Sequence, residues 1–101
     1  MASRLDLQNK LEELLGNRNV YYQPPESLKM KYPAIRYSLD DISSRHADNM
    51  KYTNFDNYEI IVIDNDPDNK VIRKILELPH SSYERHYTSN NLHHDVINLY
   101  F

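Results

Sequence analysis

Apolar residues recur three or four positions apart in the first part of the chain, which is the spacing of one buried helix face. They are Leu7, Leu11, Leu14 and Leu15. The pattern predicts a helix over residues 4–15. Ser3 and Asp6 resemble a capping box at its start, and Gly16 can adopt the left-handed conformation that ends it. A β-branched and aromatic run at 20–23 then predicts a short strand.

Two longer strands are predicted in the middle of the chain. Residues 34–39 alternate, with Ile35, Tyr37 and Leu39 on one face of the strand. Residues 58–63 are the most apolar run and lack strict alternation, so they predict a central strand covered on both faces. Between these strands, residues 40–57 are polar and predict a long hairpin or loop arm that contacts a partner; a loop without such a role is the alternative.

A second helix is expected after residue 65, with Asp66 as its N-cap and Pro67 at its first position. Pro79 is expected to end it. The apolar face of this helix comprises Val71, Ile72, Ile75, Leu76 and Leu78.

Residues 82–101 predict a closing hairpin with its turn at 88–91 and its last strand at 95–101. In this hairpin Tyr83, Arg85 and Tyr87 are expected to share one face. The apolar end of the last strand requires cover, either from the sheet or from a partner.

These elements predict one α+β domain over residues 1–101, with a small mixed, mostly antiparallel sheet, two helices packed on one face and the order α-β-β-β-α-β-β. The chain has 101 residues, of which 40% are apolar and 11% aromatic, too many for a disordered segment. One hydrophobic core is therefore expected.

Composition narrows the function classes. Nine residues are Tyr, two are Phe and none is Trp. Tyrosine is frequent at protein interfaces, although strands also favour it, so both interpretations stay open. The absence of cysteine excludes disulfides and thiolate metal sites and is typical of intracellular synthesis. A net charge of -3 argues against a dedicated nucleic-acid binder, and no run predicts secretion or membrane insertion.

The sequence contains no pattern that indicates catalysis. His93 and His94 are adjacent on a predicted strand and so point to opposite faces, while His46, His80 and His86 have no carboxylate or thiolate partner at a recognisable spacing. The acidic run 64–68 starts like a calcium loop but lacks its glycine and its final carboxylate, so helix capping explains it. We therefore expect no catalytic, cofactor-binding or metal-binding residues, and a protein that is not an enzyme.

Five stretches, in this order, resemble a family of small virion proteins from long-tailed phages (siphophages) of Gram-positive bacteria. They are 19–27 (NVYYQPPES), 30–37 (MKYPAIRY), 58–68 (YEIIVIDNDPD), 76–79 (LELP) and 87–92 (YTSNNL). Proteins of that family are described as tail-completion, tail-terminator or head-to-tail joining proteins.

The resemblance implies a non-enzymatic virion protein, made in the bacterial host cytoplasm, that forms a homo-oligomeric ring, a hexamer, at the head-proximal end of the tail tube. Such a ring ends tube growth and binds both the tail tube protein and the head connector or head-completion protein. DNA is then only a passenger through the lumen, for which the acidic excess is suited.

A ring requires a heterologous interface, and an exposed sheet edge can provide one side of it. We expect residues 20–23 or the C-terminal strand to lie at such an edge. The candidate subunit or partner contacts are Tyr21, Tyr22, Arg45, His46, Asp48, Asn49, Tyr52, Tyr100 and Phe101.

Two other function classes remain open from the sequence. One is a monomeric regulatory or inhibitor module that binds a single protein through residues 40–57. The other is a small hydrolase or nuclease that uses His86 and nearby acids, which would require a metal ion.

Overall fold

The computed structural model describes residues 4–24, 29, 31–41, 56–66 and 68–101. It confirms the predicted fold class and the order α-β-β-β-α-β-β. The elements are α1 (Arg4–Leu15), β1 (Val20–Tyr22), β2 (Ala34–Asp41), β3 (Asn57–Asp64), α2 (Val71–Leu76), β4 (Ser81–Ser89) and β5 (Leu92–Tyr100).

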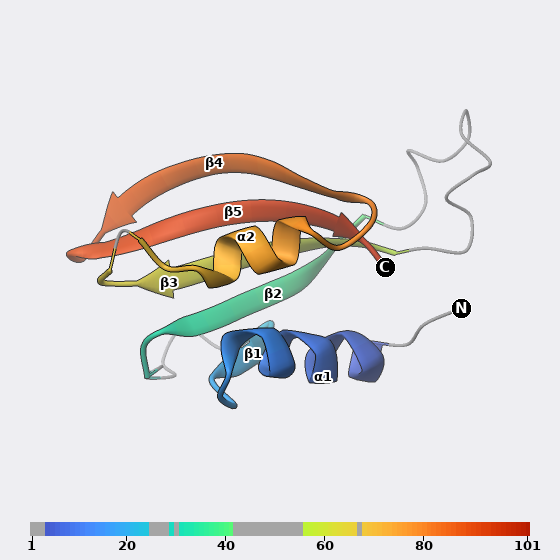
Figure 1. The fold of residues 1–101 in the computed structure, drawn as a ribbon, viewed down its shortest axis with the longest axis horizontal. Coiled ribbons are helices and arrows are strands. Elements are labelled where there is room, and N and C mark those ends of the chain that lie inside the picture. The colour runs from blue at the N-terminus through green and yellow to red at the C-terminus, as the bar shows by residue number, and fades with distance from the viewer. Residues whose placement is uncertain (1–3, 25–28, 30, 42–55, 67) are drawn as a thin grey trace.

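The five strands form one sheet in the order β1-β2-β3-β5-β4. Strand β1 runs parallel to β2, whereas the β2–β3, β3–β5 and β4–β5 pairs are antiparallel. Strand β3 is central, as its apolar run predicted, and only Glu59 and Ile61 of its eight residues are not buried; the prediction of cover on both faces is wrong, because the two described helices cover one face only. Both helices lie on the same side of the sheet (Figure 1).

The core lies between this helix-covered face and the two helices. It includes Leu7 and Leu11 of α1, the alternating side chains of the central strands, and Val71 and Ile75 of α2. In register, Tyr37, Ile60 and Ile97 lie opposite one another on β2, β3 and β5. The alternation read from residues 34–39 is thus confirmed.

A polar network fixes α1 against the sheet. Arg4 Nη1 donates to the Tyr37 hydroxyl at 3.2 Å, and that hydroxyl donates to Gln8 Oε1 at 2.6 Å. Gln8 Nε2 in turn donates to the carbonyl oxygen of Val20 at 3.0 Å. Burial raises the pKa of Tyr37, an effect that Arg4 opposes. The network satisfies a hydroxyl that would otherwise be costly to bury.

The end of α1 agrees with its predicted signal, because Gly16 has a φ of 85°. Its N–H donates to the Glu12 carbonyl oxygen at 2.9 Å, which closes the last turn. The predicted capping residue Ser3 lies outside the described residues.

The start of α2 was predicted wrongly. Asp66 does not cap it, since its Oδ1 accepts from the Asp68 N–H at 2.9 Å within the preceding turn. The N-cap is Lys70, and Asn69 Oδ1 accepts from the Val71 N–H at 2.8 Å. The helix therefore begins four residues later than the acidic run suggested.

The expectation that Tyr83, Arg85 and Tyr87 share one face is also wrong. A register shift lies between Tyr83, which is opposite Ile97, and Arg85, which is opposite Val96. A bulge of this kind inserts one extra residue, so the side chains that follow it change face. Tyr83 consequently lies on the helix-covered face, and Arg85 and Tyr87 lie on the other.

Candidate protein-interaction surfaces

Strand β4 forms one border of the sheet. Within the described part of the chain it pairs with β5 alone, and all of its residues except Ser81 are exposed. An edge strand offers unpaired backbone N–H and C=O groups to another chain. The sequence predicted that residues 20–23 or the C-terminal strand lie at an edge; β1 is the one at a border, whereas β5 lies between β3 and β4.

The turn between β4 and β5 determines which backbone groups of β4 point away from the sheet. Asn90 and Asn91 have φ values of 53° and 63°, which is the pattern of a two-residue type I′ turn. The closing pair of such a turn, here Ser89 with Leu92, is hydrogen-bonded. Pairs alternate along the ladder, so Thr88, opposite His93, has its N–H and C=O directed away from β5.

The sheet face opposite the helices carries a second candidate surface, which we call the open face. Its members are Tyr21, Ala34, Arg36, Ile61, Ile63, Arg85, Tyr87, His94 and Val96, which alternate with the core residues along their strands. No described helix covers it. Even so, Val96 is 0% exposed and Ile63 3%.

Aromatic and cationic groups surround the aliphatic centre of the open face. The rings of Tyr87 and His94 stack with centroids 4.7 Å apart and planes inclined by 12°. The Arg85 guanidinium lies 5.7 Å from the Tyr87 ring centroid. Arginine and tyrosine around an apolar centre are typical of the residues that dominate protein–protein interfaces.

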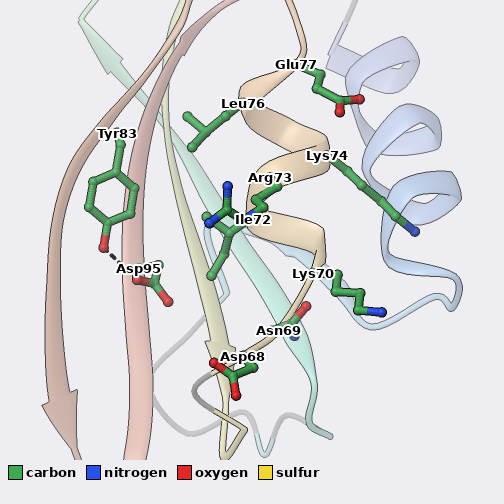
Figure 2. Close-up of a pocket in the computed structure, with 10 residues that line it drawn as sticks. All are labelled: Asp68, Asn69, Lys70, Ile72, Arg73, Lys74, Leu76, Glu77, Tyr83 and Asp95. Atoms are coloured by element: carbon green, nitrogen blue, oxygen red, sulfur yellow. Dashed lines mark hydrogen bonds between the residues drawn. The ribbon is translucent and has the colours of Figure 1, made fainter.

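A groove of about 720 Å³ lies between α2 and the β4–β5 hairpin (Figure 2). Lys70, Arg73 and Lys74 line it on the helix side, whereas Tyr83 and Asp95 line it on the strand side. Acidic and basic side chains are mixed in this lining, so the groove has no strong preference for a ligand of one charge.

Tyr83 and Asp95 form the closest polar contact of the groove. The Tyr83 hydroxyl donates to Asp95 Oδ1 at 2.6 Å, and this hydrogen bond raises the pKa of Tyr83 to about 12, with burial as a smaller cause. The side chain remains 46% exposed, so the bond is accessible to solvent. It links β4 to β5 across the strands.

The Asp95→Asn substitution is expected to lower the pKa of Tyr83 toward the ordinary tyrosine value of about 10, because a neutral amide holds the phenolic proton less strongly. In the wild type the raised pKa stabilises the folded state below the unfolded pKa, and this contribution is lost as the pH rises through about 12. NMR titration of ring-labelled tyrosine measures both values. Glu84→Gln, a neighbouring charge change, is the control; an unchanged Tyr83 pKa in Asp95→Asn would contradict the assignment.

The nine predicted contact residues fall into two groups: five outside the described residues and four within them. Arg45, His46, Asp48, Asn49 and Tyr52 lie outside the described residues, as does most of the predicted 40–57 arm. Of the four others, Tyr21 lies on the open face, half-buried, and its hydroxyl accepts from the Lys31 N–H at 3.4 Å. Tyr100 is also half-buried, at the end of β5.

Tyr22 and Phe101 are engaged within the chain. The Tyr22 ring lies 4.9 Å from that of Tyr37, and the Arg4 guanidinium lies 4.5 Å above it. Phe101 packs against the core, and its backbone exchanges two hydrogen bonds of 3.0 and 3.1 Å with Asp56. The sheet therefore supplies the cover that the apolar chain end required.

Sequence reasoning missed Arg36, Arg85, Tyr87 and His94 as neighbours on the open face. The period-two alternation of each strand carries that signal, but the strand order and the bulge determine which residues become neighbours on one face.

A helix with the length and hydropathy of a membrane span is not found in the described part of the chain. No family model, curated protein or solved structure matches the chain.

Proposed function

We propose that this chain is a non-enzymatic assembly protein that docks to copies of itself and forms a ring, a hexamer, at the head-proximal end of a phage tail tube. In this role the ring ends tube growth and joins the tail to the head connector. The phage setting rests on the sequence resemblance, and the self-docking rests on the edge strand β4.

Strand β4 is the single observation that carries the self-docking. Nine residues long and exposed along nearly its whole length, it offers outward backbone groups to an incoming strand. The opposite border, β1, has three residues and runs parallel to its neighbour. Because the two borders differ, a copy that docks on β4 through another of its surfaces makes a heterologous contact, and such a contact can close into a ring.

The open face supplies the second surface that such an assembly needs. A protein that joins two different structures must contact a neighbour and a partner with separate parts of its surface. The Arg85 and Tyr87 side chains, the latter 37% exposed, provide interface-type groups beside the β4 edge.

The experiment is to measure the mass of the purified chain by multi-angle light scattering over a wide concentration range, with and without isolated tail tubes. A mass near six times the 12.1 kDa monomer, or rings capping tube ends in negative-stain images, supports the proposal. A chain that stays monomeric at high concentration and leaves the tubes uncapped contradicts it. A closed dimer contradicts the ring, because it indicates pairing of identical edges.

A further inference from the structure

The β4–β5 hairpin brings two histidines together. His86 Nε2 lies 3.1 Å from His93 Nδ1, and the two rings lie with centroids 5.3 Å apart and planes inclined by 23°. His86 is opposite Asp95 and His93 is opposite Thr88, so the histidines are diagonal neighbours on one face of the hairpin. Diagonal pairs are within reach of long side chains, as observed here.

The backbone fixes the relative position of this pair. Both turn residues, Asn90 and Asn91, have the positive φ values that a two-residue turn requires, so the strand register is set within a few residues of His93. On the other side, β5 pairs with the central strand β3 along its length. The two imidazole rings are therefore already held close together before any ligand binds.

We propose that His86 and His93 chelate a divalent transition-metal ion such as Zn²⁺, Ni²⁺ or Cu²⁺. Imidazole nitrogens suit these ions and bind zinc at about 2.0–2.1 Å. Two bonds of that length with about 100° between them place the nitrogens about 3.1 Å apart, which is the separation found here. The separation of the two nitrogens therefore suits a shared ion.

Proton balance follows from the same contact. Without an ion, one imidazole donates its N–H to the other ring. Both nitrogens must offer a lone pair to a metal, so the bridging hydrogen leaves that nitrogen when the ion enters. It moves to the other nitrogen of the same ring when that ring is neutral, or to solvent when the ring carries two protons.

Carboxylates on the neighbouring strands face the two histidines, and the pair leaves coordination positions open. Asp95 faces His86 across the ladder, and Asp64 faces His93 from β3. One oxygen of each carboxylate already accepts a hydrogen bond, from Tyr83 at 2.6 Å and from Asn69 at 2.7 Å, so the proposed ligands are the two imidazoles. Among the described residues, no group of three or more potential ligands is present. Water, or a group from a docked chain, completes the shell.

The test is isothermal titration of the tag-free full chain with NiCl₂ and, separately, with ZnCl₂. The wild type is expected to bind one ion per chain at this site, and His86→Gln and His93→Gln are each expected to weaken binding by at least about tenfold, since a chelate loses one of its two ligands. His94→Gln is the matched control, because His94 lies on the opposite face and stacks on Tyr87.

Two further measurements keep the test decisive. Circular dichroism of each variant shows whether the hairpin is folded, and ¹⁵N NMR of the imidazoles identifies the rings whose nitrogens shift when Zn²⁺ is added. Shifts confined to His86 and His93 support the site. The proposal is overturned if the folded double variant His86→Gln/His93→Gln binds as tightly as the wild type, or if His94→Gln weakens binding as much as either single variant. The site is independent of the ring proposal, since both ligands belong to one chain.

Discussion

Under the proposed docking on β4, Thr88→Pro is expected to leave the chain as monomers of 12.1 kDa at concentrations at which the wild type would form rings. Thr88 is exposed, and the ladder directs its N–H away from β5, so proline removes a donor from the open border and none from the β4–β5 pair. Proline is tolerated in edge strands for this reason. Light scattering and sedimentation velocity measure the loss of assembled mass.

Two variants serve as controls for this substitution. Thr88→Val retains the backbone N–H and the β-branched shape, so it is expected to assemble like the wild type. Tyr87→Pro removes a donor from the β4–β5 ladder, because Tyr87 and His94 form a hydrogen-bonded pair, and it is expected to destabilise the hairpin itself. Rings of undiminished mass in folded Thr88→Pro would show that β4 is not the contact between copies.

Ile60→Ala is expected to lower the free energy of unfolding by about 3 kcal/mol, the middle of the range for truncating a large buried aliphatic side chain. Ile60 is 0% exposed and lies between Tyr37 and Ile97 in the centre of the sheet. The loss combines the transfer term of the removed methyl and methylene groups with the cavity they leave. For a domain of this size that is a large share of the total stability.

Urea unfolding followed by circular dichroism measures the change. The matched control is Ile61→Ala, one position along the same strand, where the side chain is half-buried on the open face. Its effect is expected to be clearly smaller, because less of its surface leaves water on folding. Equal losses at the two positions would mean that the open face is as tightly packed as the helix-covered face.

Local patterns were sufficient to predict most of the fold. The leucine spacing of α1, its closing Gly16 and the alternation of β2 each report on neighbouring residues, and the structure confirms them. The apolar run of β3 predicted its central place for the same reason. These patterns are reliable because each one follows from the face of the helix or strand that must be buried.

The predictions that failed depended on competition between nearby groups. Asp66 had the residue type and position of an N-cap, but its carboxylate accepts from the Asp68 N–H; the N-cap is Lys70, and Asn69 Oδ1 accepts from the Val71 N–H. At β4, one extra residue between Tyr83 and Arg85 reverses the alternation, and nothing in the local composition marks that bulge.

The candidate surfaces required information that no single segment holds. The open face joins alternating residues from all five strands, and the His86–His93 contact exists only because the hairpin register is known. The predicted arm was chosen from the composition of residues 40–57 alone. Most of that segment lies outside the described residues, so this expectation stays a prediction.

The strand order also has a consequence for the chain while it is being translated. Strand β3 lies between β2, which the ribosome makes before it, and β5, which begins 28 residues after Asp64. Until β5 emerges, the nascent chain carries an apolar strand with one border unpaired, a state that is prone to aggregate. Chaperone binding to ribosome-held chains should therefore be strongest for those that contain β3 but have not yet exposed β5.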